Sequence, residues 1–557
     1  MSTGFDRHQA GELDHYADLL RGFVPFPSAR AEQYRAAGYW TGDPLDSILR
    51  DGAQTWPQRT AIVDTQSSYT YAELDEVADR IAAGLAARGV VPGDRMLLQL
   101  PNTCQFAVAL FGLLRAGVVP VMCLPGHRSA EMAHFAAVSG AVGAVIPDRL
   151  GGFDYRVMAA DLAAEHPDLR HIIVDGPAGD FLPWSALTEY AGPPAPARSP
   201  VDTSYPALLL VSGGTTGLPK LIARTHDDYV YNARACAQAC EMTERDTYLV
   251  VLPAGHNFPL ACPGLLGSMT VGATTVFTTD PSPEACFALI DKHTVTVTGL
   301  VNALAKVWTQ ACDWEPVLPT SLRWVQVGGS RMSPQEAEYI LDGLTPGLSQ
   351  IFGMAEGMLN FTYVGDPRDV VLHTQGRPMT PMDEMKVVDE SGVEVAPGAE
   401  GELLVRGPYT LNGYYRADDA NARSFTPDGF YRSGDRVRIF ADGPRAGYVE
   451  VVGRIKDVIH RGGETVSATD LEDHLHTHPS IVFAAAVPLP DEFLSEKICA
   501  AVVFSGKPVT LAELNAYLDT RGVASHSRPD VLVPLPSLPK TAVGKVDKPA
   551  LIKQLLA

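Results

Sequence analysis

Short apolar segments alternate with helical ones in the first part of the chain, and this alternation most constrains the fold. Residues 71–89 carry apolar side chains at helical spacing, namely Leu74, Val77, Ala78, Ile81 and Leu85. The segment ends in Gly89, which is suited to closing a helix. An apolar run at 96–100, a helical segment at 105–116 and an apolar run at 118–123 follow. Strands that read as continuous apolar runs are buried on both faces, so the pattern predicts an α/β domain with a largely parallel sheet.

The pattern recurs downstream and then changes. Further apolar strands are predicted at 207–211, 247–252 and 274–277, and a helix is predicted from about His226. Turn-rich segments begin near Gly392 and indicate a β-rich subdomain, and a self-contained α+β pattern ends the chain. We therefore predict a large N-terminal domain, residues 1–455, of two α/β subdomains plus the β-rich subdomain. A small, mobile α+β C-terminal domain is predicted at residues 456–557.

Charge and cysteine content exclude several classes of protein. The 557 residues include 65 acidic and 44 basic side chains, a net charge of −21. Such a surface repels phosphate backbones and anionic lipid, so neither nucleic acid nor a membrane is expected as a partner. The eight cysteines form no C-x-x-C pair, and residues 1–22 contain four acidic side chains. These features predict reduced thiols and no secretory signal, in a cytoplasmic protein.

A segment rich in glycine and threonine follows the predicted strand 207–211. Its residues are Ser212, Gly213, Gly214, Thr215, Thr216, Gly217 and, after two more positions, Lys220. Small and hydroxylated residues let backbone N–H groups and hydroxyls surround phosphate oxygens, and the lysine adds a positive charge. The segment is not a Walker A loop, because no Gly-Lys-Ser/Thr ends it. It predicts a phosphate-binding loop, with a flexible surface turn as the alternative.

Four further segments place charged or aromatic side chains beside glycines. Phe352 offers a flat face to a base, and Glu356 in the same segment can hold Mg²⁺ on phosphates. Asp435 follows a glycine and can accept the hydroxyls of a ribose. Arg454 lies in a charged turn, and Lys545 lies on a glycine-containing loop where it can stabilise phosphoryl charge. Each segment alone can equally be a solvated turn.

The order and spacing of all five motifs resemble those of the adenylate-forming superfamily over nearly the whole chain. That superfamily contains acyl-CoA ligases, peptide-synthetase adenylation domains and firefly-type luciferases. Five segments further resemble the stand-alone aryl-acid adenylating enzymes, which are salicylate-AMP and 2,3-dihydroxybenzoate-AMP ligases: 23–27, 34–40, 255–260, 352–357 and 374–378. The resemblance implies activation of an aryl carboxylic acid with ATP and Mg²⁺.

The resemblance also assigns roles to individual residues. Lys545, Glu356 and His256 are the expected catalytic residues: Lys545 would bridge the carboxylate and the α-phosphate, and Glu356 would ligate Mg²⁺. The family rotates its C-terminal domain between two half-reactions, and Lys456 falls at the hinge position. The expected ATP-binding residues are Ser212, Gly213, Gly214, Thr215, Thr216, Gly217, Lys220, Gly329, Ser330, Arg331, Phe352, Gly353, Asp435 and Arg454.

The aryl-acid pocket implied by the resemblance consists of His256, Asn257, Phe258, Cys262, Gly328 and Ile351. Asn257 would contact the ring 2-hydroxyl and His256 the carboxylate, although a satisfied core histidine is the alternative for His256. Cys262 and Ile351 stand where the 2,3-dihydroxybenzoate pattern has serine and valine. Cysteine is a weak hydrogen-bonding partner, and the extra methylene narrows the pocket, so salicylate is favoured. 2,3-Dihydroxybenzoate and hydroxylated heteroaryl acids remain alternatives.

The expected acceptor is the phosphopantetheine thiol of an aryl carrier protein, in siderophore or nonribosomal peptide biosynthesis. An aryl-CoA ligase that uses free coenzyme A is the alternative. A luciferase-like oxidoreductase fits the small aryl pocket poorly, and a non-catalytic nucleotide-binding protein would not need Glu356, Asp435, Arg454 and Lys545 together. The sequence is compatible with a monomer or a homodimer.

Overall fold

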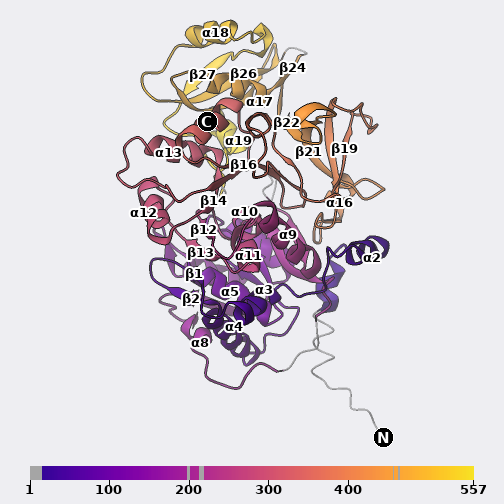
Figure 1. Cartoon of the computed structure of the whole chain (residues 1–557), viewed down its shortest axis with the longest axis vertical. Helices are drawn as coiled ribbons and strands as arrows, with labels where there is room; N and C mark the ends of the chain where they lie inside the picture. The colour runs from indigo at the N-terminus through magenta and orange to yellow at the C-terminus, as the bar shows by residue number, and fades with distance from the viewer. Residues whose placement is uncertain (1–15, 197–200, 213–218, 456, 462–463, 543) are drawn as a thin grey trace.

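The computed structural model describes residues 16–196, 201–212, 219–455, 457–461, 464–542 and 544–557 (Figure 1). The largest sheet is mostly parallel and is antiparallel at both edges. Its strands, in spatial order, are β18 (Arg377–Pro378), β17 (Leu359–Phe361), β16 (Leu348–Gly353), β15 (Trp324–Gly328), β14 (Val297–Val301), β12 (Thr247–Val250), β13 (Thr274–Phe277), β1 (Thr60–Val63) and β2 (Ser68–Thr70).

A second mostly parallel sheet lies in the N-terminal half of the chain. Its order is β11 (Leu221–Thr225), β10 (Pro206–Val211), β4 (Val119–Met122), β3 (Arg95–Leu98), β5 (Gly143–Pro147), β8 (His171–Asp175) and β9 (Leu182–Pro183). Only the pair β10–β11 is antiparallel among the described strands of this sheet. A small ribbon, β6 (Arg149–Leu150) with β7 (Phe153–Asp154), lies apart from it.

Most helices of the N-terminal region lie against these two sheets, whereas the first and the last of them lie to one side (Figure 1). They are α2 (Ser28–Ala36), α3 (Ser47–Thr55), α4 (Tyr71–Ala86), α5 (Cys104–Arg115), α6 (Ser129–Ser139), α7 (Tyr155–Glu165), α8 (Ser185–Thr188), α9 (His226–Ala239), α10 (Asn257–Ala261), α11 (Gly264–Thr270), α12 (Pro283–His293), α13 (Asn302–Ala311), α14 (Pro334–Gly343), α15 (Arg368–His373) and α16 (Asp418–Ser424). One continuous apolar core joins α4, α5, α9 and α11 to strands of both sheets. The core is large enough to hold the sheets together without a disulfide, and the eight cysteines are free thiols.

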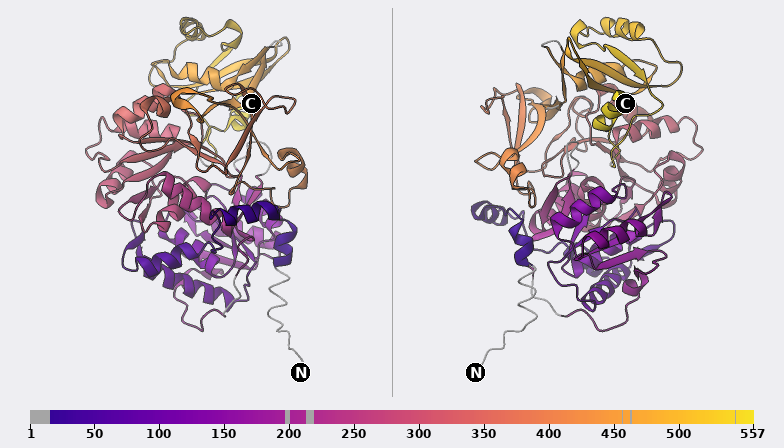
Figure 2. Two further views of the ribbon diagram at one scale, coloured as in Figure 1. Left: turned by 45° about the vertical axis from the view of Figure 1, so that its right-hand side comes forward. Right: turned by 180° about the vertical axis from the view of Figure 1, so that it is seen from behind.

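Two smaller sheets complete the chain. The antiparallel sheet β19 (Glu384–Val388), β20 (Glu400–Arg406), β21 (Tyr431–Ile439) and β22 (Val449–Arg454) is the β-rich part. The last sheet has the order β24 (Glu464–Ser467), β23 (Val458–Arg461), β26 (Ser495–Phe504) and β25 (Ile481–Asp491), and β27 (Val531–Pro534) also pairs with β26. With α17 (Ala468–His476), α18 (Leu511–Thr520) and α19 (Lys548–Leu556), this last sheet lies at one end of the molecule, as Figure 2 shows from two further sides.

The structure confirms the predicted α/β fold, with a large N-terminal part and a small C-terminal one. The predicted helix 71–89 is α4, which ends at Ala86, and Gly89 beyond it has φ +82°, a conformation that glycine adopts at little cost. The strand predicted at 274–277 has the bounds of β13. The predicted hinge, Lys456, lies outside the described residues, so the domain boundary there stays a prediction.

No helix of the described ranges is long and apolar enough to span a lipid bilayer.

Candidate active site

Lys545 extends from the C-terminal part of the chain to the carboxyl end of β15. A Cβ placed on Gly329 would lie 3.0 Å from Cε of Lys545 and 3.8 Å from its Nζ. Gly329 has φ +93°, a backbone conformation that glycine adopts without strain. The lack of a side chain at this position also allows the close approach of the lysine. Burial lowers the pKa of Lys545, and nearby Arg454 lowers it further, whereas Asp435 and Glu356 act in the opposite direction. The structure thus brings four predicted site residues into one electrostatic cluster around the lysine.

Asp435 and Arg454 pair across the antiparallel strands β21 and β22. The two residues are register partners, and Nε of Arg454 donates to Oδ1 of Asp435 at 3.1 Å. Asp435 is buried, and this burial raises the pKa of its carboxyl although Arg454 opposes the shift. Pairing the carboxylate with a guanidinium keeps it in place at the edge of the site, as its predicted role toward a ribose requires.

Glu356 is held by Tyr414, which the sequence did not reveal, and Tyr414 in turn contacts Tyr431. The hydroxyl of Tyr414 donates to Oε1 of Glu356 at 2.8 Å, and the hydroxyls of Tyr414 and Tyr431 lie 3.0 Å apart. Nζ of Lys220 lies 4.9 Å from the centre of the Tyr414 ring, a cation–π distance. Tyr414 follows Glu356 by 58 residues in an unremarkable Gly-Tyr-Tyr run, so no local signal in the sequence could have identified it.

This environment fits a magnesium ion that is shared with phosphates. Among the described residues no group of three His, Cys, Asp or Glu side chains could hold a metal by itself. Mg²⁺ in nucleotide sites typically takes one or two carboxylates and completes its octahedron with phosphate oxygens and water. Glu356, fixed through one oxygen by Tyr414, matches that requirement.

The predicted phosphate loop is described only at its ends. The backbone N–H of Ser212 donates to the Lys220 carbonyl, and the Lys220 N–H donates to Oγ of Ser212, both at 2.9 Å. These bonds continue the antiparallel pairing of β10 and β11. The predicted phosphate contacts between them lie outside the described residues: Gly213, Gly214, Thr215, Thr216 and Gly217.

Arg331, a predicted nucleotide contact, forms ion pairs with three carboxylates. Its guanidinium pairs with Asp473 of α17 at 2.9 Å, and with Glu450 and Asp470 at 3.6 and 3.8 Å. Two of these carboxylates lie on α17 of the C-terminal part and Glu450 lies on β22, while the neighbouring Ser330 is exposed. A role of Arg331 or Ser330 toward adenine stays a prediction.

His256 caps the short helix α10, and this fixes its protonation. Its Nδ1 accepts the backbone N–H of Phe258 at 3.3 Å, so the ring proton resides on Nε2. Burial, with a contribution from Lys545, lowers the pKa of His256 to about 3. The imidazole is therefore neutral at physiological pH, and its Nε2–H is a hydrogen-bond donor suited to a carboxylate.

Asn257, the first residue of α10, is buried in a hydrogen-bonded network. Its Oδ1 accepts from the hydroxyl of Tyr229 at 2.8 Å, and its Nδ2 donates to Sγ of Cys262 at 3.4 Å. The thiol of Cys262 in turn donates to the backbone carbonyl of Asn257 at 3.4 Å. The structure thus brings together Asn257 and Cys262 as predicted and adds Tyr229 from α9, which the sequence did not single out.

The remaining aryl-pocket residues meet where β14, β15 and β16 end. Gly328 and Ile351 are register partners, and a Cβ on Gly328 would lie 3.0 Å from the Ile351 carbonyl and 3.5 Å from Cε1 of Phe258. A Cβ on Gly299 would lie 3.3 Å from Cζ of Phe258, which adds Gly299 to the predicted set. Phe352 and Gly353 end β16 beside them, with Phe352 half-buried and Gly353 exposed. In α/β sheets, the carboxyl ends of strands are where ligands bind.

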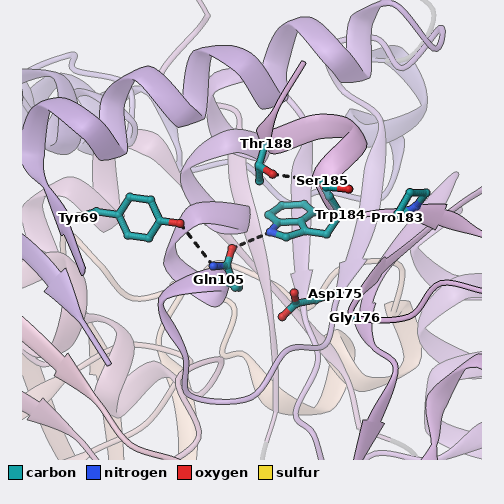
Figure 3. A pocket seen from close by; sticks show the side chains of 8 residues that line it. All are labelled: Tyr69, Gln105, Asp175, Gly176, Pro183, Trp184, Ser185 and Thr188. Carbon is teal, nitrogen blue, oxygen red and sulfur yellow. Dashed lines mark hydrogen bonds between the residues drawn. The ribbon is translucent and has the colours of Figure 1, made fainter. Parts of the chain in front are cut away.

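A separate pocket of about 250 Å³ contains none of the predicted site residues (Figure 3). Gln105 lies at its centre: Nε1 of Trp184 donates to Oε1 of Gln105 at 2.7 Å, and Nε2 of Gln105 lies 3.5 Å from the hydroxyl of Tyr69. The side chains of Tyr69, Gln105 and Trp184 are paired with one another, and the pocket does not bear on the site described above.

The chain belongs to the AMP-binding enzyme family. The sequence pattern of that family matches residues 49–415, and the pattern of the AMP-binding enzyme C-terminal domain matches residues 470–545. The membership in the adenylate-forming superfamily that the five motifs predicted is thereby confirmed.

Within this family, the chain is 63% identical over 541 residues to the salicyl-AMP ligase / salicyl-S-ArCP synthetase of Mycobacterium tuberculosis, covering 96% of this chain and 95% of that protein. It is 44% identical over 534 residues to the 2,3-dihydroxybenzoate-AMP ligase of Bacillus subtilis, covering 96% of this chain and 97% of that protein. The solved apo structure of Mycobacterium smegmatis MbtA is similar with a TM-score of 0.76 and 65% identity, covering 96% of this chain and 99% of that one.

Proposed function

We propose that this protein converts an aryl carboxylic acid, salicylate in preference to 2,3-dihydroxybenzoate, and ATP into the aryl-AMP with release of pyrophosphate. In a second step the phosphopantetheine thiol of an aryl carrier protein for siderophore biosynthesis attacks the carbonyl carbon of the aryl-AMP, so that the aroyl group becomes a thioester and AMP leaves. The observation that carries the proposal is the pairing of Asn257 with Cys262 beside Lys545 and neutral His256. The 63% identity to a salicyl-AMP ligase / salicyl-S-ArCP synthetase supports it.

In the first step a carboxylate oxygen forms a bond to the α-phosphorus, and the bond from that phosphorus to the pyrophosphate oxygen breaks. Negative charge on both reactants must be neutralised for them to approach. The ammonium of Lys545 would supply a positive charge between them, and Nε2–H of His256 would donate to the carboxylate oxygen that does not react. Because His256 is neutral, it can orient the acid without protonating the attacking group.

The other predicted residues would position the nucleotide. Asp435, held by Arg454, would accept ribose hydroxyls, and Phe352 would lie against the base. Glu356, supported by Tyr414, would hold a magnesium ion. The ion, when bound, would neutralise charge on the phosphate oxygens.

Pocket chemistry supports salicylate over its 3-hydroxylated relative. Sγ of Cys262 already exchanges two weak hydrogen bonds with Asn257, and a thiol offers a poor partner to a ring 3-hydroxyl. A buried hydroxyl without a good partner costs about 1–3 kcal/mol. Ile351 adds bulk at the same wall, where its carbonyl and Cβ closely approach Gly328.

The test is ATP–pyrophosphate exchange with a panel of aryl acids, followed by transfer to thiol acceptors. We expect salicylate to exceed benzoate at least about tenfold in kcat/KM, because benzoate leaves the second N–H of the Asn257 amide without a partner. Absence of exchange with every hydroxylated benzoic acid would refute the proposal. Supplying an aryl carrier protein or free coenzyme A as the thiol then separates the carrier-protein enzyme from the alternative aryl-CoA ligase.

A further inference from the structure

Tyr229 occupies a rigid position beside the aryl pocket. It lies in the first turn of α9, whose start is fixed by a capping box between Thr225 and Asp228. Arg224, just before the helix, donates through Nε to Asp228 at 2.8 Å, and its guanidinium lies 4.7 Å from the centre of the Tyr229 ring. Tyr229 is fully buried, so neither its ring nor its hydroxyl can move without disturbing the core.

Helix α9 holds the short helix α10 at both of its ends (Figure 1). The Tyr229 hydroxyl donates to Asn257, the first residue of α10, and Nδ2 of Asn232 donates at 2.8 Å to the carbonyl of Ala261, the last residue. The backbone that carries Asn257 is therefore fixed relative to Tyr229. Only rotation of the Asn257 amide could change the group that it presents to a ligand.

The hydrogen bonds of the amide decide that rotation. Oδ1 is directed toward Tyr229, and Nδ2 is directed toward Cys262, which belongs to the pocket wall. A primary amide has two N–H donors, and Cys262 accepts from one of them. The second N–H of Asn257 is thus the group left to meet a ring substituent.

We propose that Tyr229 is a specificity-determining positioning residue, which fixes the Asn257 amide so that the pocket presents an N–H donor to the 2-substituent of the aryl acid. The proposal rests on the function proposed above and adds a physical reason why the pocket prefers one ring 2-substituent over another. Burial raises the pKa of Tyr229 well above its ordinary value, so the hydroxyl keeps its proton and remains a donor to Oδ1 throughout the physiological range.

This rule favours a ring whose 2-substituent accepts a hydrogen bond. In salicylate the 2-hydroxyl donates its proton to the adjacent carboxylate, and its oxygen remains an acceptor for the Asn257 N–H. In anthranilate one N–H of the 2-amino group donates to the carboxylate and the other points outward. This outward N–H and the N–H of Asn257 are both donors, so they cannot form a hydrogen bond with each other. Leaving both groups unpaired in a buried site is unfavourable.

The experiment measures the ratio of salicylate to anthranilate in kcat/KM for pyrophosphate exchange, in the full chain and in Tyr229→Phe. Phenylalanine keeps the ring volume and removes the hydroxyl, which frees the amide to turn Oδ1 toward an amino group. We expect the ratio to fall at least about fivefold, mainly through KM for the two acids. Tyr71→Phe is the matched control: Tyr71 is also fully buried, and its hydroxyl makes one bond, to the Ala273 carbonyl at 2.7 Å. Its ratio should stay that of the unmodified chain.

A second variant tests the rule without relying on Tyr229→Phe. Asn257→Asp replaces the remaining donor by an acceptor, so the ratio should reverse in favour of anthranilate even though both rates fall. An unchanged ratio in Tyr229→Phe, or a retained salicylate preference in Asn257→Asp, overturns the inference and leaves the proposed function standing. A chain that exchanges pyrophosphate with no aryl acid overturns both.

Discussion

The aryl pocket and the nucleotide end of the site are held together by different interactions. The pocket is built from neutral side chains of the N-terminal part, joined by the bonds of Asn257 to Tyr229 and Cys262. The nucleotide end gathers charges from separate sheets: Asp435 and Arg454 come from the β-rich sheet and Lys545 from the C-terminal part. The residues predicted for the pocket all belong to the N-terminal part, whereas those predicted for the nucleotide end include Lys545 of the C-terminal part.

The difference suggests how the two half-reactions can share one site. Neutral buried bonds are insensitive to the position of a neighbouring domain, so the proposed acid would stay in place during the predicted rotation of that domain. Charges that belong to the moving part can be brought in for one step and withdrawn for the next. Variants on the two sides should therefore fail in different ways.

Loss of the lysine should have the largest effect. Lys545→Ala removes the positive charge beside Gly329, and pyrophosphate exchange should fall by roughly 100-fold or more. Thioester formation from supplied aryl-AMP should survive, because the pocket is intact. Lys540→Ala, an exposed lysine of the same segment, is the control and should be close to normal. Equal loss in both half-reactions would contradict the proposed difference between the aryl pocket and the nucleotide end of the site.

Opening the pocket wall should change which acid is used without changing the chemistry. The double variant Cys262→Ser with Ile351→Val supplies a better partner to a 3-hydroxyl and removes a methylene. We expect the kcat/KM ratio of 2,3-dihydroxybenzoate to salicylate to rise about tenfold in pyrophosphate exchange. An unaltered ratio would show that these two positions do not discriminate at the ring 3-position.

The Arg331 ion pairs offer a sharper test of docking. Arg331→Ala removes the pairs with Asp473, Asp470 and Glu450 and should lower kcat for exchange about fivefold, the equivalent of about 1 kcal/mol for partly exposed pairs. The KM for ATP should hardly change, and transfer from supplied aryl-AMP should be kept. Arg368→Ala, which breaks surface pairs within the N-terminal part, is the control. A raised KM for ATP with normal kcat would instead support the adenine-side role predicted from sequence.

The smallest effect concerns stability against acid. Folded His256 has a pKa of about 3, below the value near 6.5 of an unfolded histidine, so below pH 6.5 the unfolded chain takes up a proton that the folded chain does not. The stability contributed by neutral His256 is present above pH 6.5 and is lost as the pH falls toward 3. The variant His256→Asn keeps a good helix cap. Between pH 7.5 and 5.5, its free energy of unfolding should fall by about 1 kcal/mol less than that of the unmodified chain. Differential scanning calorimetry at the two pH values measures this, and identical shifts would refute the assignment.

Much of the fold could be predicted from the sequence because its signals are local. Apolar runs located β4, β10 and β13 to within about a residue. The segment His256-Asn257-Phe258 could be assigned to an aryl pocket through its resemblance to a family motif because its residues are consecutive, and that assignment stays a prediction. The secondary structure of one segment, and the relative positions of its residues, depend mainly on residues that are adjacent in the sequence.

What could not be predicted depends on contacts between distant segments. Tyr414 reaches Glu356 across 58 positions, and Tyr229 reaches Asn257 across 28. Neither tyrosine differs in sequence from a core tyrosine, which is the commoner role. Arg331 was placed beside adenine by its neighbours in the chain, and its partners on α17 became evident only once the two parts were packed together.

The bare backbone at Gly329 limits how the chain can vary. Any β-carbon there would occupy space that the methylene chain of Lys545 fills, and would do so in a backbone conformation that other residues avoid. Alanine at 329 would thus obstruct the arriving ammonium while leaving every reactive group unaltered. The absence of one methyl group at Gly329 thus leaves room for the side chain of Lys545, whose proposed role is to bring a positive charge to the reactants.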